Sequence, residues 1–274
     1  MTITTIARLR RDVAALSERV SPHRPALTPL EVADRAGIVP DPWQGDLLRS
    51  DARQIIILAS RQSGKSTTTA MLAAHRAAVV SDSLVLLLSP ALRQAQELFL
   101  KVRGVLLALG DAAPPIVEAS TLRVELVNGS RVVCLPGRED TIRGYSGVSL
   151  LLVDEAARVP DALYHAVRPM LAVSGGRLVL LSTPFGKRGF FHHEWTEGGP
   201  AWARFTVTAE QCPRIDPGWL AQERAAIGDW WFTQEYLCAF VETDDQFFRF
   251  DDITAAITPE VAPLFPIGGT TDAA

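Results

Sequence analysis

Short, wholly apolar runs recur along the chain, and longer segments of mixed polarity separate them. Four runs have the composition of strands buried on both faces of a sheet: Ile55–Leu58, Leu84–Leu88, Ser149–Val153 and Arg177–Leu181. The segments between them carry apolar residues at helical spacing and predict helices over about residues 66–79, 90–109 and 160–171. This alternation predicts an α/β fold with a mainly parallel sheet and helices on both faces.

Two further regions follow other patterns. The segments 122–126 and 131–135 alternate in polarity around Asn128-Gly129, which predicts an inserted antiparallel β-hairpin. Beyond Pro200 we expect one strand, two helices and a short closing strand, at residues 203–208, 216–227, 229–237 and 239–242. Near the N-terminus, residues 5–20 predict an amphipathic helix, Thr28-Pro29 begins a second helix that ends near Gly37, and Pro40–Gln44 predicts an irregular turn.

Composition narrows the class of protein. Hydrophobic residues make up 47% of the 274 residues and charged residues 21%, as is typical of a soluble globular domain. The formal net charge of −4 means that any contact with nucleic acid must depend on a local basic patch. The three cysteines are far apart, which favours neither a disulfide framework nor a zinc site. No signal peptide or membrane span is apparent, so we expect a soluble protein of the cytoplasm with no membrane partner.

The strongest chemical signal is ASRQSGKST, residues 59–67, which follows a buried strand and precedes a helix. Backbone N–H groups at such a turn bind phosphate oxygens, and Gly64 lets the backbone approach them closely. Lys65 can reach the β- and γ-phosphates, and the Ser66 hydroxyl can ligate Mg²⁺. Ala59 stands where the usual phosphate-loop pattern has its first glycine. The expected nucleotide-binding residues of the loop are Ser60, Arg61, Gln62, Ser63, Gly64, Lys65, Ser66 and Thr67.

A second signal is LLLVDEAARVP, in which a buried strand ends in two adjacent carboxylates. Asp154 at the strand tip is suited to hold Mg²⁺ beside Ser66, and Glu155 to orient or deprotonate a water. Parallel sheets bind ligands at the carboxyl ends of their strands, so both motifs predict one site for ATP and Mg²⁺.

Two weaker features agree with a nucleotide site. Gln44, on the turn before the phosphate loop, is a candidate to hydrogen-bond adenine, although a Pro-Trp-Gln turn is more often a packing feature. Ser182 and Thr183 end the fourth buried strand, where hydroxyl groups can sense the γ-phosphate; the alternative is a strand-ending turn set by Pro184.

In order and spacing, PDPWQ, SRQSGKST, LLLSPALRQAQELF, the NGS hairpin, TIRGYSG, LLLVDEAA and LLSTPFGKRGFF resemble the ATPase domain of the large terminase subunit of tailed phages. The resemblance covers about residues 38–245 and implies a motor that packages double-stranded DNA into a prohead. It implies a homo-oligomeric ring, pentameric in the family, with a portal protein and a small terminase subunit as partners. An isolated chain is expected to be a monomer. Ser182 and Thr183 would belong to the coupling motif, and Arg143 or Arg61 would act in a neighbour's site.

The resemblance also sets the expected domain division: an N-terminal helical segment (1–37), a P-loop ATPase domain (38–245) and a C-terminal tail (246–274). The nuclease domain of complete large terminases has no counterpart in this sequence, so we expect no DNA cleavage. Two alternatives stay open: a helicase-like DNA translocase, and a decayed prophage protein that binds nucleotide without motor activity.

Overall fold

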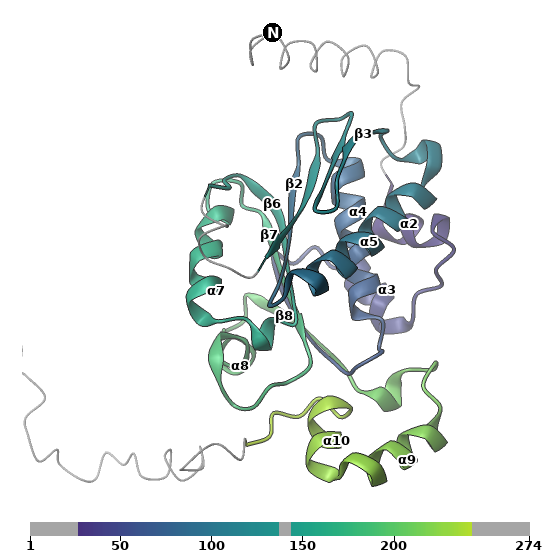
Figure 1. Cartoon of the computed structure of the whole chain (residues 1–274), viewed down its shortest axis with the longest axis vertical. Coiled ribbons are helices and arrows are strands. Elements are labelled where there is room, and N and C mark those ends of the chain that lie inside the picture. The colour runs from purple at the N-terminus through teal and green to yellow at the C-terminus, as the bar shows by residue number, and fades with distance from the viewer. Residues whose placement is uncertain (1–26, 137–143, 243–274) are drawn as a thin grey trace, which may run out of the picture. The chain divides into compact units, whose positions relative to one another are not determined.

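The computed structural model describes residues 27–136 and 144–242. A single sheet of eight strands organises these residues, in the spatial order β3-β4-β5-β2-β6-β7-β1-β8 (Figure 1). The strands span Gln54–Ala59 (β1), Leu84–Ser89 (β2), Ile116–Ala119 (β3), Arg123–Leu126 (β4), Arg131–Pro136 (β5), Val148–Asp154 (β6), Arg177–Ser182 (β7) and Trp202–Val207 (β8).

Parallel pairing dominates this sheet. Strands β5, β2, β6, β7, β1 and β8 pair in parallel with their neighbours, whereas β3, β4 and β5 pair antiparallel. All side chains of β2 and β6 are buried, as expected for strands covered on both faces. The predicted α/β fold with an inserted hairpin is therefore confirmed, and β3 is an additional edge strand that the sequence analysis missed.

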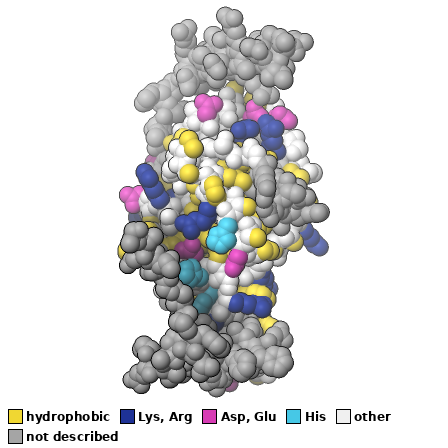
Figure 2. Space-filling view, turned by 90° about the vertical axis from the view of Figure 1, so that its left-hand side faces the viewer, with side chains coloured by type: hydrophobic (Ala, Val, Ile, Leu, Met, Phe, Trp, Pro, Cys, Tyr) yellow, Lys and Arg dark blue, Asp and Glu magenta, His cyan; other side chains and the backbone are white. Residues whose placement is uncertain are grey.

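Helices cover both faces (Figure 1). One face carries α2 (Pro29–Arg35), α3 (Pro42–Arg49), α4 (Lys65–Val79) and α5 (Leu92–Ala108), and the other carries α7 (Asp161–Val167) and α8 (Gly189–Thr196). Alternate residues of β1 divide between the two cores: Ile55 and Ile57 pack with the α2–α5 layer, and Ile56 and Leu58 with the α7–α8 layer. Figure 2 shows the side with α7 and α8, where basic, acidic and apolar side chains are interspersed among the described residues.

A helix pair follows the sheet. Helices α9 (Pro217–Ile227) and α10 (Asp229–Glu235) form a small apolar cluster of their own through Leu220, Phe232 and Tyr236. The N–H of Ala209, just beyond β8, donates to the carbonyl oxygen of Tyr236 at 2.8 Å. This contact fastens the end of α10 to the carboxyl end of the sheet, where the candidate site lies.

Two expectations about local structure are wrong. Pro42–Arg49 is the helix α3, where we expected an irregular turn; Asp41 is its N-cap residue and Pro42 its first residue, a position that proline suits. Residues 239–242 form no strand, because β8 is the last strand of the sheet and no described strand pairs with this segment. The predicted helix at residues 5–20 lies outside the described residues. Among the helices that the structure describes, none is long and apolar enough to cross a membrane.

Candidate nucleotide site

The loop between β1 and α4 has the backbone conformation of a phosphate cradle. Gln62 and Gly64 have φ values of 62° and 91°, in the left-handed region that glycine adopts most easily. A Cβ on Gly64 would lie 2.7 Å from Nε2 of Gln44, so the position needs glycine both for its φ and for space. Helix α4 begins at Lys65, which directs its N-terminal N–H groups and the positive end of its dipole toward the loop.

Side chains of the same segment hold the loop in shape. Ser63 Oγ donates to the carbonyl oxygen of Ser60 at 2.9 Å, and Thr68 Oγ1 donates to that of Gly64 at 3.0 Å. The N–H of Ser60 donates to the carbonyl oxygen of Val207 at 2.9 Å, which joins the loop to β8. The cradle is thus formed before any phosphate binds.

The two adjacent carboxylates face this loop from the end of β6. Ser66 Oγ donates to Asp154 Oδ2 at 3.4 Å, and Lys65 Nζ lies 3.4 Å from Glu155 Oε1. Glu155 has a φ of 50°, and its N–H donates to Asp154 Oδ1 at 3.0 Å. This strained turn directs the two carboxylates to different partners, so the four residues that the two motifs predicted do come together.

Burial controls the ionisation of Asp154. Loss of solvation raises its pKa from 3.8 to about 6, Glu155 raises it further and Lys65 opposes the rise. A divalent cation would reverse this effect because its charge stabilises the ionised carboxylate. Ser66 Oγ and Asp154 Oδ2, two adjacent oxygen ligands beside a phosphate cradle, suit the hard cation Mg²⁺.

The residues predicted to sense the γ-phosphate contact the same site. Ser182 Oγ donates to Glu155 Oε2 at 3.5 Å, and Thr183 Oγ1 accepts a hydrogen bond from Arg158 Nη1 at 3.1 Å. Both hydroxyls are buried at the carboxyl end of β7, which pairs with β1 and β6. They are therefore in direct or one-residue contact with Glu155.

Arg158 and Glu235 belong to the site although the sequence analysis did not select them. Arg158 Nη1 also donates to Glu155 Oε2, and its Nη2 donates to Glu235 Oε1, each at 3.1 Å. Glu235 Oε2 accepts from Arg61 Nε at 2.7 Å. Burial disfavours the charge of Glu235, but the two arginines outweigh burial and lower its pKa below 4.5. The spacing of Glu155 and Arg158 within one turn was a usable signal, whereas nothing local indicates Glu235.

Gln44 lies at the loop, but its side chain is already partly engaged. Its Oε1 accepts from the N–H of Asp41 at 2.8 Å, and its Nε2 faces Gly64. Arg214 joins the same region, donating to Asp41 Oδ1 at 2.7 Å and to the carbonyl oxygen of Ser63 at 3.1 Å. The adenine contact of Gln44 stays a prediction, and Arg143 lies outside the described residues.

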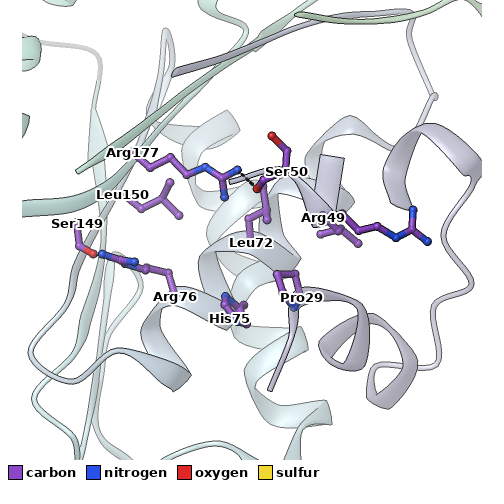
Figure 3. A pocket seen from close by; sticks show the side chains of 10 residues that line it. Pro29, Arg49, Ser50, Leu72, His75, Arg76, Ser149, Leu150 and Arg177 are labelled. Atoms are coloured by element: carbon purple, nitrogen blue, oxygen red, sulfur yellow. Dashed lines mark hydrogen bonds between the residues drawn. The ribbon is translucent and has the colours of Figure 1, made fainter. Parts of the chain in front are cut away.

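A cavity of about 220 Å³ lies elsewhere, near the amino ends of β6 and β7 (Figure 3). Arg177 Nε donates to the carbonyl oxygen of Ala52 at 2.7 Å, and its Nη2 donates to that of Ser50. Arg76 donates to Ser149 Oγ, and His75 Nε2 to the carbonyl oxygen of Leu27 at 2.7 Å. These cationic side chains hold chain segments together and are remote from the carboxyl ends of the strands.

A phosphate cradle after β1 and paired carboxylates after β6, on a mainly parallel sheet, define a P-loop nucleotide-binding protein. Within that class the chain belongs to the terminase large subunit family: residues 56–255 match the family model described as "Terminase large subunit, T4likevirus-type, N-terminal". The family that the sequence motifs resemble is thereby confirmed.

Known proteins agree with this family membership. The terminase large subunit of Thermus phage G20c is 25% identical to this chain over 77% of the chain and 51% of the phage protein. The chain thus spans about half the length of this curated relative. The large terminase ATPase domain of Thermus phage P74-26 has the same fold, with a TM-score of 0.69 at 24% identity, covering 76% of this chain and 97% of that domain. The large terminase of another thermophilic bacteriophage, in complex with ADP, matches with a TM-score of 0.59 at 14% identity, over 78% of this chain and 53% of that protein.

Proposed function

We propose that this chain is the ATP-hydrolysing domain of a DNA-packaging motor, in which hydrolysis drives double-stranded DNA into a prohead. The observation that carries the proposal is the convergence of Lys65, Ser66, Asp154 and Glu155 at the carboxyl ends of β1 and β6. Complexes of the large terminase of that thermophilic bacteriophage with ADP and with ATP-γ-S support nucleotide as the ligand. The family match supports packaging as the process.

Each residue has a distinct task in this proposal. Lys65 leaves Glu155 and binds the β- and γ-phosphates, while the loop N–H groups hold the phosphate oxygens. Ser66 and Asp154 hold Mg²⁺, which would neutralise the charge that develops on the phosphates. Glu155, released from Lys65, accepts the proton of the attacking water. Ser182 and Thr183 follow the resulting movement of Glu155 and Arg158 and transmit it along β7.

The assembly is proposed from the family. Its members would be a ring of this subunit, pentameric as the resemblance implies, a portal protein, a small terminase subunit and DNA, in the cytoplasm of a bacterial host. On the face in Figure 2, basic and acidic side chains are interspersed among the described residues, so the DNA contact is expected on another face. A translocase grips backbone phosphates uniformly, so we expect no sequence preference.

An arginine from a neighbouring subunit would complete the site. Arg61 is held by Glu235 of its own chain, which supports Arg143 as the residue that acts in trans. Such arginines increase turnover by about 10³–10⁵-fold. Mixing the Arg143→Ala and Glu155→Gln variants should then restore part of the activity, because some mixed sites pair an intact Glu155 with an intact Arg143. A mixture that stays inactive while concentrated wild type is active would favour Arg61.

The decisive experiment separates binding from hydrolysis. Glu155→Gln keeps the size of the side chain and removes the base, so it should bind Mg²⁺–ATP with near wild-type affinity and hydrolyse it very slowly. Asp154→Asn should instead weaken the Mg²⁺-dependent part of ATP binding. Isothermal titration of ATP with and without Mg²⁺, together with steady-state phosphate release with and without double-stranded DNA, measures both. Normal hydrolysis by both variants at saturating ATP would contradict the assignment.

A further inference from the structure

Glu235, the last residue of α10, lies between two arginines at the edge of the nucleotide site. One carboxylate oxygen accepts from Arg61 Nε at 2.7 Å and the other from Arg158 Nη2 at 3.1 Å. The side chain is only 8% exposed, so water does not compete effectively for these contacts. A buried carboxylate with both oxygens engaged by guanidinium groups is firmly fixed in position.

Arg158 carries this fixed position to the reacting group. Its Nη1 donates to Glu155 Oε2 and to Thr183 Oγ1, both at 3.1 Å, while its Nη2 is held by Glu235. The guanidinium group lies over the ring of Phe185, 4.7 Å from its centre. Because the fork of an arginine is rigid, holding one nitrogen on Glu235 fixes the direction in which the other presents itself to Glu155.

The backbone provides a second link from α10 to the loop. The N–H of Arg61 donates to the carbonyl oxygen of Glu235 at 3.3 Å, so Glu235 contacts the phosphate loop with both its side chain and its main chain. The carboxylate of Glu235 therefore contacts one arginine from each of the two nucleotide motifs.

We propose that Glu235 is a positioning residue for ATP hydrolysis, which orients Glu155 through Arg158 and the phosphate loop through Arg61. This inference rests on the proposed ATPase function of the site. The same contacts work in the opposite direction: if the arrangement of α10 changes the site, then ATP binding must change α10 by the same coupling free energy. Helix α10 is then the element to which nucleotide binding is first transmitted.

Two variants test the proposal, because loss of a buried counter-charge carries a risk of misfolding. Glu235→Gln removes the charge, and Arg158→Lys keeps a charge but loses the fork that joins Glu155 to Glu235. Each should lower kcat about tenfold or more while the dissociation constant of Mg²⁺–ATP stays near that of wild type. The double variant should be no slower than the slower single variant, because both changes break the same line of contacts.

A matched control comes from the same helix pair. Glu223 in α9 accepts a hydrogen bond from the hydroxyl of Tyr236, the neighbour of Glu235 in sequence, at 3.1 Å, whereas the carboxylate contacts of Arg61 and Arg158 described above go to other glutamates. Glu223→Gln should leave kcat unchanged. If Glu223→Gln lowered kcat as much as Glu235→Gln, the effect would be a general loosening of α9 and α10 and the proposal would be wrong.

A second measurement is independent of hydrolysis. Hydrogen–deuterium exchange of the α10 amides should change when ATP-γ-S binds to the wild type and should not change in Glu235→Gln. Equal kcat values and equal exchange responses in the two proteins would overturn the inference alone. Failure of the wild type to bind nucleotide, by titration, would contradict the proposed function and the inference with it.

Discussion

The two ends of the sheet both contain buried arginines, but these have different partners. At the carboxyl end, Arg61 and Arg158 bind carboxylates, and one of these, Glu155, is the proposed catalytic base. At the amino end, Arg177 binds two backbone carbonyl oxygens and Arg76 a serine hydroxyl (Figure 3). Carboxylates and incoming phosphates compete for the same guanidinium groups, whereas a backbone carbonyl has no such competitor.

Backbone conformation differs between the two ends in the same sense. Gln62 and Glu155, two of the four non-glycine residues with positive φ among the described residues, both belong to the nucleotide site. Such conformations cost of order 1–3 kcal/mol each and persist where the surrounding structure enforces them. The carboxyl end thus concentrates strain and rearrangeable charge, and the amino end concentrates contacts that only stabilise the fold.

The largest expected effect is at the carboxyl end. Lys65→Ala removes the charge that binds the β- and γ-phosphates and should lower kcat at least about 100-fold. The melting temperature should change little, because Glu155 keeps its contact with Arg158. Steady-state phosphate release and thermal unfolding measure the two quantities. Unchanged turnover would remove the phosphate-loop assignment.

At the amino end the same kind of substitution should act on stability. Arg177→Met removes the donors to the carbonyl oxygens of Ser50 and Ala52 and should lower the free energy of unfolding by about 1–3 kcal/mol. Turnover measured well below the melting temperature should equal that of wild type. Denaturant titration and a phosphate-release assay check this, and lost turnover at unchanged stability would show that the two ends do not differ as described.

A smaller effect at the amino end depends on pH. Burial lowers the pKa of His75 below its ordinary value of 6.5, with a hydrogen bond to Leu27 opposing the shift and the charges of Arg76 and Arg177 adding to it. The unfolded chain then binds a proton that folded His75 does not, so its contribution to stability is complete above pH 6.5 and is lost as the pH falls below that value.

His75→Gln should therefore flatten the decline of the unfolding free energy below pH 6.5. Denaturant titrations over a pH series measure this slope. His193→Gln is the control, because His193 is exposed and its ion pair is with the exposed Glu197. The same slope in wild type and His75→Gln would contradict the prediction.

The smallest effect is expected at the rim of the amino-end cavity. Arg49 forms an ion pair with Asp46 at 3.2 Å, and the two side chains are 62% and 71% exposed. Solvent screens such a pair, so Arg49→Ala should change stability by less than about 1 kcal/mol and leave turnover unchanged. A larger loss in denaturant titration would show that the cavity itself, rather than its backbone contacts, stabilises this end.

Local patterns predicted most of the fold. The apolar runs that become β1, β2, β6 and β7 are buried on both faces wherever they lie in the sheet, so their composition alone identified them. The strand β3 was missed because its residues are mostly exposed and lack that composition. The helix α3 was missed because Pro42 was interpreted as part of a turn, although the preceding Asp41 is typical of a helix N-cap.

The sequence by itself determined the chemistry of the site. A glycine-containing turn between a strand and a helix, and two carboxylates at a strand tip, converge because parallel strands present their carboxyl ends at one edge. Only the tertiary structure decided how the charges pair. Arg61 and Glu235 lie 174 positions apart, and Arg158 and Glu235 lie 77 apart. No periodicity extends over such separations: these pairs exist because α10 packs against the end of the sheet, and that packing depends on the whole core.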